Sequence, residues 1–336
     1  MPARMTSESA TFDRLDRQIL HGLQLAPRVP FARLGAVLGV SEQTAARRYQ
    51  RMRTLGIARV FGAVDHARLP GAATWMVRLT CRPGTAMPTA EALARRPDTS
   101  WVMVGAGGAE LTTSIAAVAG QQGLLHHLPR AANVLSVSAH QILHRFAGRG
   151  EADWIAGDDR LDDNQRRELI TPTEEVTINT DMSQEDQPLI NALAHDGRAS
   201  FAALADATGW TQRRAASRLN ALTAAGFLRF DVDTSATALG FHAVAHLWFT
   251  VAPADLASVG ARLADHQQLA WAAAVTGSAN IVAVALSTDA AALYDYLTTE
   301  VAAIPEVRNC ETVPVLTRVK QAVSLVDNGI LRGPLA

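Results

Sequence analysis

The N-terminal part of the chain carries apolar residues at the spacing of an amphipathic helix. These apolar positions are Leu15, Ile19, Leu20 and Leu23. A second short helix is expected at residues 31–38, and Gly39 ends it. Ser41 then caps a third helix, which Gly56 ends. Three helices with a glycine turn between the second and the third are typical of a helix-turn-helix unit.

The same pattern returns 170 residues later without a gap, since residues 12–60 align with residues 182–230. Identical pairs in this register include Asp16/Asp186, Arg28/Arg198, Phe31/Phe201, Gly39/Gly209 and Arg48/Arg218. A gapless register over this length indicates an internal duplication.

Segments of alternating apolar and polar residues follow each helical unit. In the first copy we expect strands or helices at 74–80, 89–95, 100–105, 111–118, 121–128 and 134–143. In the second copy we expect them at 244–251, 255–266, 270–276, 281–287, 290–301 and 307–316. The periodicity gives each copy the order strand, helix, two strands, helix, strand, which is the ferredoxin-like βαββαβ arrangement.

The expected fold class is therefore α+β, with two winged helix-turn-helix units and two ferredoxin-like βαββαβ domains in tandem. The expected boundaries are 12–62 and 182–232 for the helical units, 63–147 and 233–326 for the βαββαβ domains, and 148–181 for a linker. The linker holds ten acids and four arginines and is predicted to be extended, with one short helix near Asn164–Leu169.

Charge is distributed unevenly along the chain. The net charge is −1, so a basic surface must be local. Residues 12–60 carry nine arginines against three acids, whereas residues 182–230 carry five arginines against four acids. A local surplus of arginine favours DNA binding through the release of counterions. The alternatives are a solvated face on a three-helix bundle, and a second copy whose role is purely structural.

In the DNA-binding interpretation, the third helix enters the major groove and its polar N-terminal residues contact bases and phosphates. The candidate DNA-binding residues of the first copy are Ser41, Gln43, Thr44, Arg47, Arg48 and Arg51. Those of the second copy are Thr211, Gln212, Arg213, Arg214, Ser217 and Arg218. We expect the three arginines of the first copy to contribute most of its affinity.

Two glycine-rich turns occupy equivalent positions in the βαββαβ domains. Neither has the strand-then-helix context or the lysine of a phosphate loop. One interpretation is a tight hairpin, which the residues alone favour. The other is a pocket for a small effector, with Glu110 or Asn280 as its polar anchor. The candidate effector-binding residues are Gly105, Gly107, Glu110, Thr276, Gly277 and Asn280.

Together these features resemble the Lrp/AsnC family of transcription regulators. The resemblance rests on LDRQIL at 15–20, the turn at 31–39, SEQTAARRY at 41–49, LGI at 55–57 and the two glycine turns. It implies a DNA-binding regulator whose βαββαβ domains bind a small effector, often an amino acid, and pair through their sheets. The family's turn usually reads G-x-x-D, whereas here Glu110 and Asn280 take the place of the aspartate. Members usually have one such unit, so this chain resembles a fused pseudo-dimer.

Siroheme decarboxylases have a similar fold, so the alternative is an enzyme that acts on a tetrapyrrole. The candidate residues for such chemistry are His126, His127, His140, His144 and Arg145. In those enzymes we expect a strand rich in tyrosine and arginine. The corresponding strands here, at 100–105 and 270–276, are apolar, which argues against the enzyme. We find no other catalytic arrangement and therefore predict that the chain is not an enzyme and uses no cofactor and no metal.

The remaining expectations concern location and assembly. The two cysteines lie far apart and lack metal-ligand spacing. The N-terminal residues lack an apolar leader, and no apolar run is long enough to cross a membrane. We therefore expect a cytoplasmic protein that binds double-stranded DNA and a small effector and assembles into at least a dimer of chains.

Overall fold

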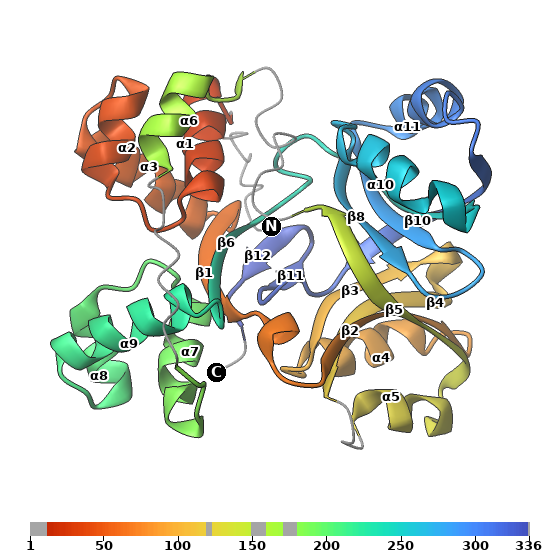
Figure 1. Cartoon of the computed structure of the whole chain (residues 1–336), viewed down its shortest axis with the longest axis horizontal. Coiled ribbons are helices and arrows are strands. Elements are labelled where there is room, and N and C mark those ends of the chain that lie inside the picture. Colours follow the sequence, from red (N-terminus) through yellow and green to blue (C-terminus); the bar gives the residue numbers. More distant parts are fainter. Residues whose placement is uncertain (1–11, 119–122, 149–158, 171–179, 335–336) are drawn as a thin grey trace, which may run out of the picture.

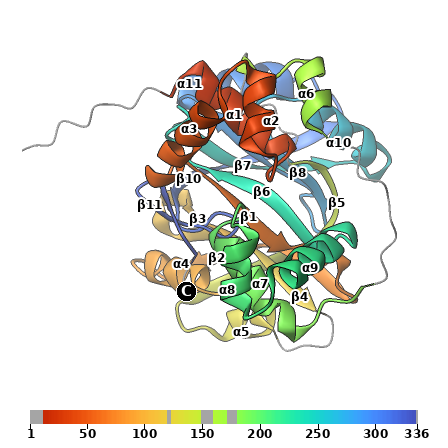
Figure 2. The same cartoon turned by 90° about the vertical axis from the view of Figure 1, so that its left-hand side faces the viewer.

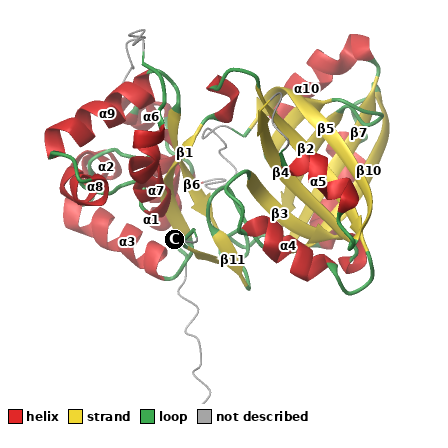
Figure 3. Cartoon of the chain, turned by 90° about the horizontal axis from the view of Figure 1, so that it is seen from below, coloured by secondary structure: helices red, strands yellow, loops and turns green. Residues whose placement is uncertain are grey.

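The computed structural model describes residues 12–118, 123–148, 159–170 and 180–334. The chain forms two bodies, one mainly helical and one that contains most of the strands, as Figure 1 and the view from below in Figure 3 show. The helical body contains both copies of the three-helix unit, and the second body is a β-barrel with helices on its outside. Among the described residues, no helix is both long and apolar enough to span a membrane.

Each helical unit folds as the apolar spacing predicts. The apolar face of the first unit packs into one core that includes Ile19, Leu34 and Met52, and the second unit has an equivalent core. The capping hydroxyls form as expected, because Ser41 and Thr211 each accept a hydrogen bond from a backbone N–H at the start of the third helix. The helices are α1 (Arg14–Leu25), α2 (Phe31–Leu38), α3 (Glu42–Thr54), α7 (Gln187–His195), α8 (Phe201–Thr208) and α9 (Gln212–Ala224).

One strand follows each third helix: β1 (Ala58–Val64) and β6 (Leu228–Thr234). These two strands pair with each other in an antiparallel ribbon, from Ala58 opposite Thr234 to Val64 opposite Leu228. The prediction of winged units is wrong in this respect. A wing needs a hairpin within one unit, whereas each unit here supplies a single strand whose partner comes from the other copy.

Part of the predicted linker belongs to the first helical unit. The helix expected near Asn164–Leu169 is present as α6 (Asp163–Leu169). Leu161 and Leu169 are buried in the core of the first unit, and the Leu161 N–H donates to Nδ1 of His21 at 2.9 Å. This stretch is therefore a packed fourth helix and its lead-in, rather than extended chain.

The barrel domains follow the predicted order of strands and helices. The first copy consists of β2 (Ala72–Cys81), α4 (Ala86–Ala94), β3 (Thr99–Gly105), β4 (Glu110–Val118), α5 (Leu124–His127) and β5 (Val134–Ala147). The second copy consists of β7 (Ala243–Val251), α10 (Leu256–Ala264), β8 (Leu269–Val275), β9 (Ile281–Ser287), α11 (Ala290–Tyr296) and β10 (Val307–Arg318). The predicted helix at 121–128 begins outside the described residues, and α5 represents its described part.

The two sheets join into one closed barrel in the order β10-β3-β4-β2-β5-β8-β9-β7. Closure depends on two long strands, because β5 continues from β2 onto β8 of the other copy, and β10 continues from β7 onto β3. The interior between the sheets therefore contains residues of both copies.

A C-terminal hairpin, β11 (Leu325–Asp327) and β12 (Ile330–Arg332), extends past the predicted end of the last domain. The Leu331 N–H donates to the Gly56 carbonyl, where α3 ends, at 2.9 Å. Ser235 after β6 donates to the Gly329 carbonyl, and the Ser324 N–H donates to the Asp233 carboxylate. The hairpin thus links the first helical unit, the β1–β6 ribbon and the barrel (Figure 1).

Candidate functional site

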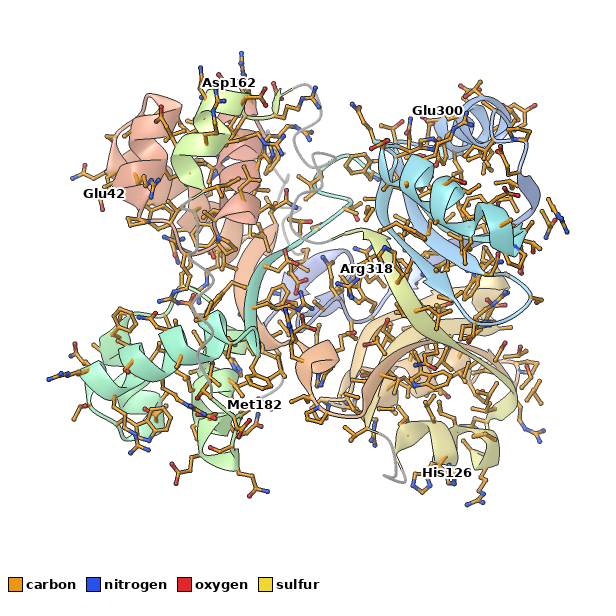
Figure 4. All side chains as sticks on the ribbon, viewed as in Figure 1. Glu42, His126, Asp162, Met182, Glu300 and Arg318 are labelled. Carbon is orange, nitrogen blue, oxygen red and sulfur yellow. The ribbon has the colours of Figure 1, made fainter. Side chains whose placement is uncertain are left out.

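The third helices lie on the side of the helical body that faces away from the barrel. Figure 2 looks onto this side, with α3 and α9 on diagonally opposite sides of the β1–β6 ribbon. Glu42, the first residue of α3, lies at the outer edge of the body in Figure 4. The two helix N-termini are therefore accessible to a large partner that approaches from this side.

The predicted DNA-binding residues fall into two groups. Gln43, Arg47, Gln212 and Arg213 are exposed, and neither Arg47 nor Arg213 has a hydrogen-bond or ion-pair partner among the described residues. Arg48, Arg51 and Arg218 instead bind carboxylates of their own helical units. The first group, together with the exposed Ser217, is available to an external ligand without breaking a contact.

The second group forms an ion pair that recurs in both copies. In the first copy, Arg48 lies 3.2 Å and Arg51 2.6 Å from Asp16, whose side chain is 0% exposed. In the second copy, Arg218 donates from Nε and Nη2 to Asp186, each at 2.6 Å. Burial alone would raise the pKa of Asp186, but hydrogen bonds from Arg218 and Ser183, together with the charge of Arg218, outweigh burial and lower this pKa. The guanidinium groups of Arg48 and Arg51 hold the third helix against the first, and their role in DNA binding stays a prediction.

The start of α9 borders an open groove of about 630 Å³. Trp210 and Arg214 stack there, with the guanidinium carbon 4.5 Å from the ring centroid. Arg214 also lies 3.1 Å from Glu185. Ser217, at the place that Arg47 takes in the first copy, lines the same groove. The two third helices thus present different chemistry at matching positions.

The glycine turns lie at the contact between the two barrel copies. Gly105 approaches Pro314 of the other copy, and Gly277 approaches His140. Gly107 is exposed. The Thr276 hydroxyl accepts from the Gln141 N–H at 2.9 Å, and the Thr276 carbonyl is 2.6 Å from Nδ1 of His140.

The two proposed effector anchors are engaged within the chain. The Asn280 amide bonds both the N–H and the carbonyl of Val251, at 3.0 and 2.8 Å. Both carboxylate oxygens of Glu110 accept from Arg78, at 3.0 and 3.1 Å. Effector binding at these turns stays a prediction, and an effector that uses these groups must first displace their present partners.

Arg78 joins the two copies inside the barrel. Besides Glu110 it binds Glu311 of the second copy, through donor–acceptor distances of 2.8 and 2.7 Å. Its guanidinium carbon lies 4.9 Å from the ring centroid of Trp248, also from the second copy. Its hydrogen bonds to the carboxylates of Glu311 and Glu110 raise the pKa of this guanidinium. Sequence reasoning missed this residue, although a lone arginine in the apolar strand TWMVRLT was a visible signal.

His246 is another polar residue on the inner side of the barrel, and it is buried. Desolvation, with a smaller effect from Arg318 and Arg78, lowers the pKa of His246 to about 4. Arg318 itself lies between the helical body and the barrel (Figure 4), and burial lowers its pKa to about 10. His246 is therefore neutral in the folded chain at pH values where an unfolded histidine is already protonated.

As the pH falls, the unfolded chain takes up a proton on His246 at a higher pH than the folded chain does. The free energy of unfolding therefore keeps the contribution of neutral His246 above about pH 6.5 and loses it as the pH falls toward 4. We expect the wild type to lose about 2 kcal/mol more of its unfolding free energy than His246→Leu between pH 7.5 and 5. Urea unfolding at both pH values measures this difference. Equal losses in the two proteins would mean that His246 does not control this pH dependence.

The histidines named for tetrapyrrole chemistry do not form one cluster. His140 contacts Thr276 and stacks on Trp248, whereas His144 packs edge-on against Phe146. His126 and His127 belong to α5 on the outside of the barrel. Arg145 lies on β5 opposite Ala273. In the described parts of the chain, no group of His, Cys, Asp or Glu side chains has an arrangement that would hold a metal ion.

Comparison with family models identifies the domains of this chain. The AsnC-type helix-turn-helix domain matches residues 12–53 and again residues 182–223, and the Lrp/AsnC ligand binding domain matches residues 244–325. The chain belongs to the Lrp/AsnC family. Within this Lrp/AsnC chain the helix-turn-helix domain is present twice, as the repeat predicts. No curated protein sequence matches the chain.

Solved structures give a second comparison. The siroheme decarboxylase NirDL is 14% identical, covers 92% of this chain and 93% of its own, and has a TM-score of 0.59. The same enzyme in complex with an iron-uroporphyrin III analogue gives the same identity and coverage, with a TM-score of 0.58. AsnC of E. coli is 23% identical and covers 41% of this chain and 94% of its own, with a TM-score of 0.38.

The match with NirDL overturns the prediction that this Lrp/AsnC chain is not an enzyme. The fold shared over 92% of the chain is that of an enzyme, so enzymatic activity is compatible with the whole architecture. The sequence argued against this activity because two strands of the chain are apolar and its histidines are scattered. Both arguments are about individual residues rather than about the fold. At 14% identity, the likeness itself concerns the fold.

Proposed function

We propose that the chain is a sequence-specific, DNA-binding transcription regulator of the Lrp/AsnC type. The observation that carries this proposal is the pair of AsnC-type helix-turn-helix domains whose third helices begin at the exposed side of the helical body. Each third helix has a hydroxyl cap and unpaired polar side chains next to it. This arrangement is the one by which a helix enters the major groove.

In this proposal the exposed residues contact DNA and the ion-paired arginines orient the helices. Gln43 and Gln212 contact base edges, and Arg47 and Arg213 contact bases or phosphates. Ser41, Thr44, Thr211 and Ser217 are the shorter polar groups at the same helix ends. Arg214 approaches DNA from the groove beside Trp210, where the negative charge of Glu185 partly offsets its positive charge.

We further propose that a small effector, such as an amino acid, acts at the boundary between the barrel copies. Its ammonium group would replace the Arg78 guanidinium on Glu110. Because Arg78 also binds Glu311, this exchange would loosen a contact between the copies and change their relative position. Location in the cytoplasm and assembly of two or more chains belong to the same proposal.

Selection of bound sequences from a random DNA pool tests the DNA-binding proposal. The full chain is expected to enrich a defined site whose affinity falls steeply with salt. Arg47→Ala and Arg213→Ala are each expected to weaken binding to that site about 10-fold and to reduce the salt slope by about 1. Arg308→Ala, a change at an exposed barrel residue, is the matched control. No enriched site for the folded chain would refute the proposal.

A tetrapyrrole enzyme is the second candidate, and the observation that favours it is the whole-chain likeness to NirDL. A titration with an iron uroporphyrin, followed by its visible absorbance, distinguishes the candidates. Saturable binding at one site per chain would favour the enzyme, and a product with fewer carboxyl groups, formed with release of CO2, would establish it. Unchanged absorbance at equal concentrations of ligand and protein would leave the regulator as the better account.

A further inference from the structure

Two arginines at the same position of the repeat hold the helical units together. Arg28, between α1 and α2, donates to the carbonyls of Gly197 and Ala199 in the second unit, the latter at 3.1 Å. Arg198, between α7 and α8, donates to the carbonyls of Pro27 and Val29 in the first unit, at 2.6 and 2.7 Å. We call this reciprocal contact the arginine clamp.

Aromatic rings of the opposite unit complete each half of the clamp. The Arg28 guanidinium carbon lies 5.3 Å from the ring centroid of Phe230, and that of Arg198 lies 4.1 Å from the ring of Phe31. Burial lowers the pKa of both guanidinium groups. Each cation is therefore partly desolvated between a backbone and a ring, where cation–π contacts are strongest.

The units also meet through contacts independent of the clamp. Gly197 lies against the backbone of Phe61, where an added Cβ would be 2.6–2.7 Å from backbone atoms, so only glycine permits this approach. Arg53 lies 2.8 Å from Asp196, and the β1–β6 ribbon pairs along its whole length. Together with the clamp, these contacts restrict the motion of one unit relative to the other.

We infer that the two helix-turn-helix units form one rigid body that recognises a directional, non-palindromic DNA site with two half-sites at a fixed separation. This inference rests on the proposed DNA-binding function. A rigid pair fixes the distance and the angle between the third helices, and hence the spacing that both can contact at once. Matching positions differ in the two helices, with Gln43 against Arg213, Thr44 against Arg214 and Arg47 against Ser217.

A distance measurement tests rigidity without DNA. Gln50 and Asn220 are exposed at matching positions of α3 and α9. Spin labels at Gln50→Cys and Asn220→Cys, with Cys81 and Cys310 replaced, are expected to give one narrow distance distribution. Adding Arg28→Ala and Arg198→Ala is expected to broaden it, whereas adding Arg95→Ala at the barrel surface is not. A broad distribution without these changes would overturn the rigid pair.

A spacing series then tests recognition by the full chain on its selected site. Inserting five base pairs between the half-sites turns them to opposite faces of the duplex, and inserting ten restores the face but lengthens the span. Both insertions are expected to lower affinity about 100-fold, since only one unit can then bind. Inverting one half-site is expected to have the same effect. In the Arg28→Ala/Arg198→Ala variant the losses should shrink below about 10-fold.

The outcomes of the two experiments distinguish a failure of this inference from a failure of the proposed DNA-binding function. Affinity unchanged by insertion, on a selected site, would overturn fixed spacing while DNA binding stands. A selected site with two identical, inverted halves would overturn the directional reading. A narrow distance distribution with no selected site would refute DNA recognition, and with it this inference, while the rigid pairing of the units would stand as a structural property.

Discussion

Replacing Asp16 by alanine is expected to lower the free energy of unfolding by about 3 kcal/mol. Asp16 is fully buried and binds both Arg48 and Arg51. Its loss removes the buried carboxylate that joins α1 to both arginines of α3, leaving the pair of Arg48 with Asp13. It also removes the N3 carboxylate of the capping box that Asp13 and Asp16 form. The two arginines are partly exposed, so they regain some hydration, which keeps the effect below the upper end for broken buried pairs.

Chemical denaturation followed by circular dichroism measures this loss. Asp206→Ala, at an exposed position of α8, is the matched control and is expected to change stability by less than about 0.5 kcal/mol. Asp186→Ala should resemble Asp16→Ala, because Asp186 binds Arg218 in the second copy. A loss near zero for both buried aspartates would contradict the structural role of the ion pair. In that case DNA contact would be the remaining role predicted for Arg48 and Arg218.

The repeat predicted this ion pair only indirectly. Asp16, Arg48 and their counterparts are identical in both copies, but sequence reasoning assigned the arginines to DNA because arginine on a third helix suits phosphate. A contact between α1 and α3 depends on how the helices cross, which residue spacing within each helix does not give. An acid and an arginine retained together in both copies were the available signal for a pair.

Elements were predicted more accurately than their partners. Strands such as residues 281–287 match β9 because their apolar character reflects burial on a sheet. The β1–β6 ribbon, the closure of the barrel and the arginine clamp were missed, since each joins residues far apart in the chain. Pairing of the two sheets was expected only from the family resemblance. Pairing between copies is decided by edge hydrogen bonds and complementary shape, and local periodicity carries neither.

The glycine turns illustrate the same limit at the level of the site. Sequence reasoning offered a tight hairpin or an effector pocket, with Glu110 and Asn280 as anchors. It had no way to locate Arg78 next to Glu110, because that contact links adjacent strands β2 and β4 and then crosses to β10. The charge on Glu110 is thus already balanced from within the chain, and this changes what an effector must do to bind.

Replacing Arg78 by alanine is expected to destabilise the barrel by about 3 kcal/mol. The change leaves Glu110 and Glu311 facing the same space without a cation and removes the contact with the buried Trp248 ring. Glu311 is about half exposed, with a side chain at 49%, so it recovers hydration and moderates the loss. Arg95→Ala, at an exposed helix end of the same domain, is the control and is expected to have little effect.

A charge-neutral variant separates lost packing from unpaired charge. Arg78→Met combined with Glu110→Gln and Glu311→Gln keeps similar volumes and removes all three charges, so it is expected to recover most of the stability. Urea unfolding of the single, triple and control variants makes this comparison. If the triple variant is as unstable as Arg78→Ala, the stabilising contribution of Arg78 comes from its hydrogen bonds to Glu110 and Glu311 and its cation–π contact with Trp248, because neither lost volume nor unpaired charge then explains the loss. If Arg78→Ala is as stable as the wild type, the contacts of Arg78 between the two copies contribute nothing to the free energy of unfolding. Exchange of Arg78 for an effector ammonium group would then no longer explain how a ligand changes the relative position of the copies.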